Sequence, residues 1–263
     1  MNEHDETMSP EQMPEENTAQ DLEQRQEATP EHSQADDLAQ RQEEEREQAD
    51  EEEAWQPNGD VYVYKLDNTL YINLTNRCTN ACEFCERQYG DGVGPYRLWI
   101  EHEPEAAEVL AQFEGKGLRA CKEVVFCGFG EPTMRLSVLL TVARAVKAIA
   151  PGIPVRLNTN GHANLINGGN ITPRLKGLID VVSISLNAPL AHEYTKICRP
   201  EFGEKAFAGL LDFAQKCTRY VPQVVFSVVD IIGEENIEKC RKIARECGAR
   251  LRIRPYNEGN PGE

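Results

Sequence analysis

Predicted strands and helices alternate regularly from Trp55 onward, and this alternation restricts the fold more than any other feature of the chain. Short runs rich in β-branched residues predict strands at residues 70–74, 123–127, 154–158, 181–186, 223–229 and 250–255. Amphipathic stretches between them predict helices at about residues 103–113, 136–149, 172–178, 204–220 and 234–247. Pro173 and Gly248 lie where such residues commonly start and end helices.

Six strand–helix units of roughly thirty residues each require right-handed crossover connections, and these connections produce a parallel sheet. The part of the chain that follows Trp55 is too short for the eight units that close a full barrel. The predicted fold class is therefore α/β, a partial (βα)6 barrel of parallel strands. Its open side could admit a substrate or a partner protein.

The first part of the chain has a different composition. Residues 1–54 contain 20 Asp and Glu against three Arg, so they contribute −17 to a total net charge of −16. Because this segment has few aromatic and β-branched residues, it cannot bury enough apolar surface to offset chain entropy. We expect a disordered acidic tail at residues 1–57 and one folded domain at 58–263. Nucleic acid is not an expected partner of the tail, because its charge repels phosphates.

The sequence contains no stretch that resembles a secretory signal and no apolar run that approaches the length of a membrane span. These features predict a cytoplasmic protein. Nine cysteines in a reducing compartment indicate metal ligation or core packing before disulfides.

The unusual residues of the chain follow the predicted strands. In order along the chain, the segments at the strand ends are the cysteine cluster, GFGEP (128–132), NTNG (158–161), SLNAP (185–189), DIIGEEN (230–236) and RPYNEG (254–259). In parallel α/β folds, the C-terminal edge of the sheet is where ligands bind. We therefore expect these six segments to converge on one site.

Cys78, Cys82 and Cys85 form the cysteine cluster, in a C-x3-C-x2-C pattern. The pattern could belong to a zinc site that lacks one ligand, to three packed thiols or to an iron–sulfur site. The nearest histidine, His102, is too distant in sequence for usual zinc-ligand spacing, and a polar loop is poor core material. A cubane cluster ordinarily takes four thiolates, so three would leave one iron open to another ligand.

These three cysteines, with Phe84 before the last of them, resemble the signature loop of the radical S-adenosylmethionine (SAM) enzymes. The likeness spans about residues 70–256 and includes the Gly-Glu-Pro turn at 130–132. It implies that the cysteines bind a [4Fe–4S] cluster whose open iron binds the amine and carboxylate of SAM. In this family, an electron from the reduced cluster cleaves SAM to a 5'-deoxyadenosyl radical, which abstracts hydrogen from a substrate.

The resemblance also implies a set of SAM contacts. Carbonyl groups of the glycine-rich turn and one carboxylate would accept the SAM ammonium, although a Gly-x-Gly after a strand is often only a tight turn. Polar residues at the third and fourth strand ends are candidates for the ribose and the carboxylate, but each could instead cap a helix or close a turn. Residues 229–232 and 254–256 resemble segments that flank adenine. The predicted cofactor-binding residues are Phe84, Gly128, Phe129, Gly130, Glu131, Asn158, Thr159, Asn160, Ser185 and Asn187.

Within the family, the stretches LYINLTNRCTNACEFC, YRLWIEHEP and VVFCGFGEPT are most similar to the TatD-associated radical SAM proteins, which occur near or fused to a TatD-type hydrolase. This likeness implies an electron donor of the flavodoxin or ferredoxin type, and it makes a TatD-type hydrolase or another protein a candidate partner. Three function classes stay open. They are hydrogen abstraction from a small or nucleotide-like molecule, activation of a partner protein, and non-catalytic iron–sulfur sensing.

Several remaining residues have simpler predicted roles. The other six cysteines (Cys121, Cys127, Cys198, Cys217, Cys240 and Cys247) form no second cluster motif. Cys240 and Cys247 lie two helical turns apart on one face and are interpreted as core packing. Cys198, on the predicted loop after the fourth strand, is the candidate for a further role. His162 is interpreted as a polar loop residue, and residues 89–98 as a candidate lid loop.

Overall fold

The computed structural model describes residues 59–255. The predictions of a disordered tail at residues 1–57 and of an adenine contact at Tyr256 lie outside the described residues.

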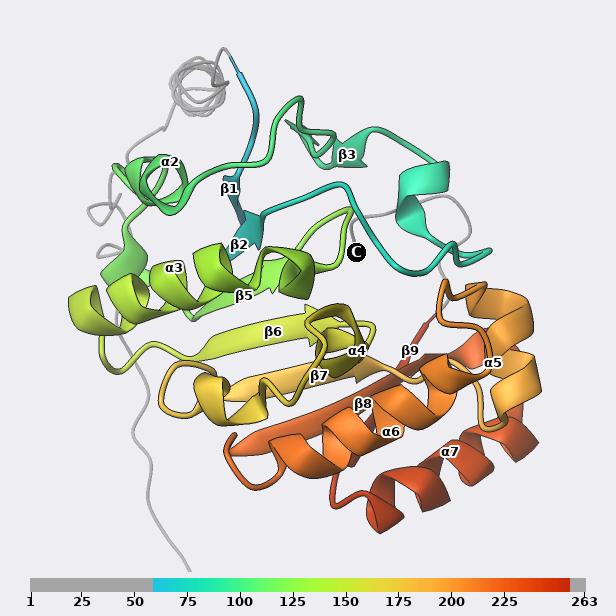
Figure 1. The fold of residues 1–263 in the computed structure, drawn as a ribbon. Helices are drawn as coiled ribbons and strands as arrows, with labels where there is room; N and C mark the ends of the chain where they lie inside the picture. The colour runs from blue at the N-terminus through green and yellow to red at the C-terminus, as the bar shows by residue number, and fades with distance from the viewer. Residues whose placement is uncertain (1–58, 256–263) are drawn as a thin grey trace, which may run out of the picture. The chain divides into compact units, whose positions relative to one another are not determined.

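Seven strands form the main sheet, in the order β1-β2-β5-β6-β7-β8-β9 (Figure 1). Six of them are parallel, as predicted. Each lies within one residue of its predicted bounds, as β2 (Thr69–Asn73), β5 (Glu123–Cys127), β6 (Val155–Thr159), β7 (Val181–Ser185), β8 (Gln223–Val229) and β9 (Arg250–Arg254). This arrangement fits a partial barrel of the predicted α/β class.

The strand β1 (Val63–Leu66) was not predicted. It pairs antiparallel with β2 through a tight turn at residues 67–68, so the sheet is mixed rather than entirely parallel. Asp67 adopts a positive φ of 49° in this turn, as short hairpin turns require. A two-residue hairpin needs no crossover helix. The alternation of strands and helices therefore does not predict β1.

The helices differ from the prediction mainly in length and number. The long ones, α3 (Leu136–Ile149), α6 (Lys205–Cys217) and α7 (Glu234–Glu246), lie where expected, and α2 (Ala106–Ala111) is shorter than expected. Residues Thr172–Leu175 form a single 3-10 turn instead of the predicted helix 172–178. Two short helices were missed, α4 (Ala163–Ile166) and α5 (Ala191–Cys198). None of the helices within residues 59–255 is long and apolar enough to cross a membrane.

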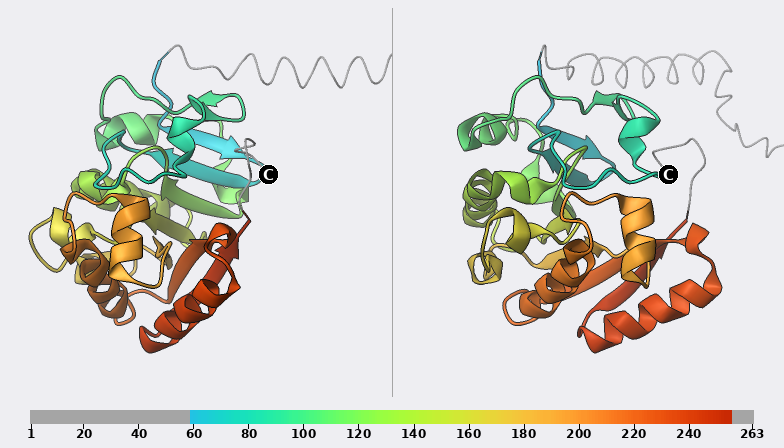
Figure 2. Two further views of the ribbon diagram at one scale, coloured as in Figure 1. Left: turned by 90° about the vertical axis from the view of Figure 1, so that its right-hand side faces the viewer. Right: turned by 45° about the vertical axis from the view of Figure 1, so that its right-hand side comes forward.

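The helices α3, α6 and α7 cover one face of the sheet (Figures 1 and 2). Apolar strand residues such as Phe126, Leu157 and Phe226 point toward these helices and form the main core. Because strand side chains alternate, the intervening residues point to the opposite face, which we call the inner face. The inner face includes Tyr71, Cys127, Asn158, Ser185 and Ser227, of which the strand register pairs Ser185 with Ser227.

The predicted lid at residues 89–98 contains a short hairpin of β3 (Gly92–Val93) and β4 (Tyr96–Arg97). This hairpin packs on the β1 side of the inner face. The ring of Tyr96 lies 5.4 Å from that of Tyr64, which itself stacks on Tyr71 at 5.2 Å. The segment therefore covers one end of the inner face.

Candidate active site

The three predicted cluster ligands lie on the loop that follows β2, which we call the cysteine loop (residues 75–88). Cys78, Cys82 and Cys85 are all half-buried free thiols. Burial raises the pKa of Cys78 to about 12 and also raises that of Cys85. Uncoordinated thiols at these positions are therefore protonated at neutral pH, and binding a metal would have to displace their protons.

Arg87 holds the cysteine loop to the rest of the site. Its guanidinium donates to the carbonyl oxygens of Asn76 at 3.2 Å, Asn80 at 3.3 Å and Phe129 at 3.4 Å. One side chain thus ties both ends of the loop to the segment after β5. Its positive charge also favours thiolates, because it acts to lower the pKa of Cys78 and Cys85 against the larger effect of burial.

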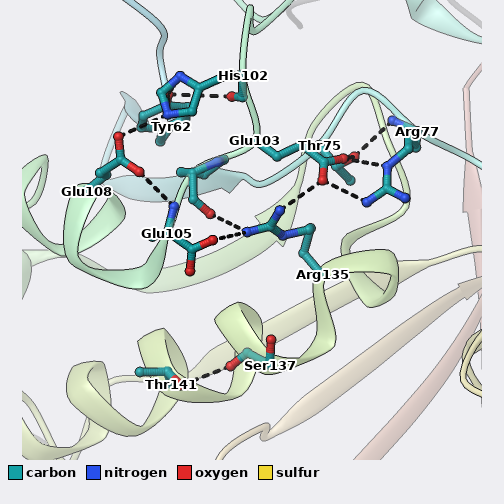
Figure 3. Close-up of polar contacts among 11 residues, drawn as sticks. Tyr62, Thr75, Arg77, His102, Glu103, Glu105, Glu108, Arg135, Ser137 and Thr141 are labelled. Atoms are coloured by element: carbon teal, nitrogen blue, oxygen red, sulfur yellow. Dashed lines mark hydrogen bonds and ion pairs between the residues drawn. The ribbon is translucent and has the colours of Figure 1, made fainter.

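Glu103 anchors the start of the cysteine loop (Figure 3). Arg77 donates to its two carboxylate oxygens at 2.6 and 2.7 Å, and Arg135 donates to it at 2.9 Å. The hydroxyl of Thr75 also donates to this carboxylate. Burial by itself would raise the pKa of Glu103, but these hydrogen bonds outweigh it and hold the pKa at about 2. The carboxylate therefore stays charged and joins the loop to the start of α3.

A buried polar network lies beneath the cysteine loop. The ring nitrogens of His162 contact the hydroxyls of Thr79 and Tyr194, both at 3.1 Å. Asn80 donates to the same Tyr194 hydroxyl at 3.0 Å. Burial lowers the pKa of His162 to about 4, so the ring is neutral at physiological pH. His162 lies in the loop between β6 and α4, as predicted, but it is fully buried and contacts two residues of other segments there.

The helix α5 packs against the same loop, and Figures 1 and 2 show it beside the segment that follows β2. The backbone nitrogens of Ala81 and Glu83 donate to the carbonyls of Cys198 at 2.9 Å and Ile197 at 3.0 Å. These two bonds flank Cys82, whose thiol interacts electrostatically with that of Cys198. Cys198 was predicted to lie on a loop, but it is the fully buried last residue of α5.

The glycine-rich turn after β5 packs directly under the cysteine loop. A Cβ at Gly130 would lie 2.2 Å from the carbonyl oxygen of Thr75, and one at Gly128 would lie 2.3 Å from the side chain of Asn73. Gly128 also has a φ of 118°. These glycines thus allow a close approach between two backbone segments. Between them, Phe129 is buried with its ring 5.1 Å from that of Trp99.

Glu131 was predicted to accept the SAM ammonium, but its carboxylate is almost fully buried and already has four internal donors. Thr133 donates from its backbone at 3.1 Å and from its hydroxyl at 2.7 Å. The Thr159 hydroxyl donates at 2.8 Å and the Asn160 backbone at 2.7 Å. Burial raises the pKa of Glu131, although these bonds oppose the rise. In this arrangement Glu131 joins the ends of β5 and β6.

Three other predicted SAM contacts likewise have internal partners. Thr159 bonds to Glu131, and the side-chain amide of Asn160 donates to Thr79 at 2.9 Å and lies 3.7 Å from the sulfur of Cys78. Asn187, with a φ of 58°, donates from its amide to the sulfur of Cys198 at 3.4 Å, and its own Oδ1 is buried without a partner. These side chains shape the surroundings of the cysteine loop.

The remaining predicted contacts differ from these. Asn158 and Ser185 are half-buried on the inner face, and no side-chain hydrogen bond joins either one to residues 59–255. Both polar groups therefore stay available to a ligand. Phe84 is half-buried and packs against the main core.

Sequence reasoning missed most of the residues that support the loop, chiefly Arg87, Glu103, Tyr194 and His162. Glu103 lies in the stretch WIEHEP, whose charged residues are visible in the sequence. Its partners Arg77 and Arg135 come from separate segments, and the sequence does not indicate that they meet. Tyr194 belongs to α5, a helix of eight residues that is too short to show a sustained apolar period. No local pattern in the sequence could have identified it.

The chemistry of this donor set fits an iron–sulfur cluster. No three Cys, His, Asp or Glu side chains of residues 59–255 gather closely enough to hold a single metal ion. Each thiolate of a cubane cluster binds a different iron, so its ligands need not converge as those of one zinc ion must. Three half-buried thiols on one loop, of which Cys78 lies close to the amide of Asn160, match that requirement.

Comparisons with known proteins agree with this geometry. The model of the Radical SAM superfamily matches residues 72–247, more than half of the chain. Streptococcus suis SuiB, in a crystal structure with its precursor peptide SuiA, is similar at 14% identity and a TM-score of 0.52, with coverage of 86% of this chain and 46% of that one. The FeFe-hydrogenase maturase HydG from Carboxydothermus hydrogenoformans is similar at 14% identity and a TM-score of 0.51, with coverage of 72% and 44%.

The chain therefore spans less than half the length of these two structures. At such low identity the likeness establishes the fold alone. A search of curated proteins finds no match.

Proposed function

Because the chain belongs to the radical SAM superfamily, whose members use a [4Fe–4S] cluster and SAM, we propose that it is a radical SAM enzyme. When bound, the reduced cluster supplies the electron that cleaves SAM to a 5'-deoxyadenosyl radical, which abstracts a hydrogen atom from a small or nucleotide-like substrate. The observation that carries the proposal is the position of three half-buried thiols on one loop, at the C-terminal edge of a parallel sheet.

The protein's own residues would have two tasks. Cys78, Cys82 and Cys85 would hold the cluster, while Arg87 and Glu103 keep their loop in place. Asn158 and Ser185, whose polar groups have no partner in the described part of the chain, would bind SAM directly. Glu131, Thr159 and Asn160 would act by positioning the backbone around the cofactor, since their polar groups already bond one another.

The subgroup and the partners are also part of this proposal. The stretches around the cysteine loop resemble TatD-associated radical SAM proteins, which supports a TatD-type hydrolase as a partner and a flavodoxin or ferredoxin as electron donor. Nine free thiols suit a reducing compartment, and we propose the cytoplasm. Action on a partner protein is the second candidate, favoured by the structural likeness to SuiB, which was crystallised with a precursor peptide.

The test is anaerobic reconstitution of the full chain with iron and sulfide, reduction with dithionite, and chromatographic detection of 5'-deoxyadenosine from added SAM. The variant with Cys78, Cys82 and Cys85 all changed to Ala should form no product. A matched control with Cys217→Ala, a buried thiol in α6, should keep both cluster and product. A cluster without SAM cleavage would favour the sensor class, and no cluster at all would refute the proposal.

A further inference from the structure

The strand β9 presents three arginines on the inner face at one edge of the sheet. Arg250, Arg252 and Arg254 alternate along the strand and so share a face. They pair in register with Val225, Ser227 and Val229 of β8, while the intervening Leu251 packs against the main core on the helix side. In the strand order β9 lies at the opposite end from β1 (Figure 1).

None of these arginines forms an ion pair or a side-chain hydrogen bond with a carboxylate among residues 59–255. The inner face contains one other arginine, Arg156 of β6, and it forms an ion pair with Glu123 at 2.7 Å. A positive charge on this face is thus neutralised in the middle of the sheet and not at the β9 edge. Charged residues on an exposed edge strand often have no role beyond preventing strand pairing with another chain. That role by itself is enough to explain the exposed Arg250 and Arg252.

Arg254 needs a different explanation. Its Nε is buried and has no hydrogen-bond partner among the described residues. Burial lowers the pKa of Arg254, and the nearby charge of Glu86 only partly opposes this effect. A buried donor of a charged group is costly when it is left unsatisfied. Prevention of strand pairing does not require it.

Glu86, at the end of the cysteine loop, interacts electrostatically with Arg254. Glu86 lies just after Cys85 and acts electrostatically on Arg254, on Cys127 of β5 and on Tyr64 of β1. The charge that acts on Arg254 thus belongs to the end of the cysteine loop, although β9 is remote from β2 in the strand order. In addition, Ser185, Ser227 and Arg252 form one polar row across three neighbouring strands.

We propose that Arg252 and Arg254 form a subsite for an anionic group, a carboxylate or a phosphate, of the substrate. The assignment of this anion to the substrate rests on the proposed function, and the subsite itself rests only on the β9 geometry. Adjacent strands are about 4.8 Å apart, so Arg252 lies roughly 10 Å from Ser185, a proposed SAM contact. An anion bound there would place the rest of the substrate toward the cofactor.

The experiment measures binding of inorganic phosphate and of citrate to the reconstituted full chain by isothermal titration calorimetry at fixed low salt. The native chain should bind at least one of the two saturably, and the preferred one distinguishes phosphate from carboxylate. Arg254→Gln should weaken that binding at least tenfold, and the double variant with Arg252→Gln should abolish it. Arg245→Gln makes the same charge change on the exposed surface of α7 and should alter the affinity less than twofold.

Two results would overturn the subsite. One is the absence of saturable binding of both anions, and the other is an equal loss of affinity in the Arg245 control, which would indicate a general charge effect. Displacement of the anion by saturating SAM would overturn its assignment to the substrate. Because binding is read without turnover, a chain that binds the anion but yields no 5'-deoxyadenosine would count against the proposed function and leave the subsite intact.

Discussion

At the scale of single residues, Glu103 is expected to make stability depend on pH. Its pKa is held at about 2 in the folded chain, below its ordinary value of 4.5. This depressed pKa contributes stability that is fully present above about pH 4.5 and is lost as pH falls toward 2. Urea unfolding between pH 7 and pH 3 should therefore show a steeper loss for the native chain than for Glu103→Gln.

At pH 7, the same Glu103→Gln variant should be less stable by about 1–3 kcal/mol, because Arg77 and Arg135 lose a charged acceptor. Glu114→Gln is a suitable control, since Glu114 is exposed and its side chain forms no hydrogen bond or ion pair with the described residues. Parallel pH profiles of the native and Glu103→Gln chains would contradict the role given to Glu103.

The Cys198→Ala variant tests whether the buried thiol of Cys198 is a cluster ligand or only supports the cysteine loop. The Cys198 sulfur accepts a hydrogen bond from Asn187, and its helix is tied to the loop by backbone bonds. We expect Cys198→Ala to retain the iron and sulfide content of the native chain after reconstitution, whereas Cys82→Ala loses it. Visible absorption of the cluster gives the readout. Equal loss in both variants would make Cys198 a ligand.

At the scale of elements, the contact between the glycine-rich turn and the cysteine loop should be intolerant of any side chain. Gly130→Ala would push a Cβ into the backbone oxygens of Thr75 and Arg77 at 2.2 and 2.6 Å. Such overpacking should cost about 1–3 kcal/mol of unfolding free energy and reduce cluster content. Gly152→Ala is the matched control, because nothing lies within 4 Å of the added atom. Similar stability of the two variants in urea would refute a tight contact at Gly130.

The elements also show what sequence reasoning can and cannot reach. The six parallel strands were predictable because each is a compact β-branched run, and they align the segments of the site at one edge. The strand β1 and the helix α5 were missed, since the first is a hairpin arm and the second is short and polar. For the site, the cysteine ligands were predictable because their spacing lies within eight residues of sequence. The burial of the Glu131 carboxylate was not, because it depends on hydrogen-bond donors of Thr159 and Asn160 that only the fold brings near.

At the scale of the whole molecule, charge is divided very unevenly along the chain. Residues 1–54 hold 20 of the 44 Asp and Glu but only three of the 28 Lys and Arg, so removing them changes the net charge from −16 to +1. Because that segment is poor in apolar residues, its deletion should leave the calorimetric unfolding midpoint and the cluster content unchanged. A fall in the midpoint of more than about 3 °C would show that the tail stabilises the domain.

The backbone hydrogen bonds between α5 and the cysteine loop affect the order in which the site can form during synthesis. Glu83 and Arg199, joined by an ion pair at 2.6 Å, are 116 residues apart in the chain. At roughly 5–20 residues per second, the ribosome would release the loop several seconds before it makes the helix that braces it. During translation the three thiols would therefore lie for several seconds in a loop that α5 does not yet hold in place. We expect the cluster to be inserted only after the chain has been extended past Arg199.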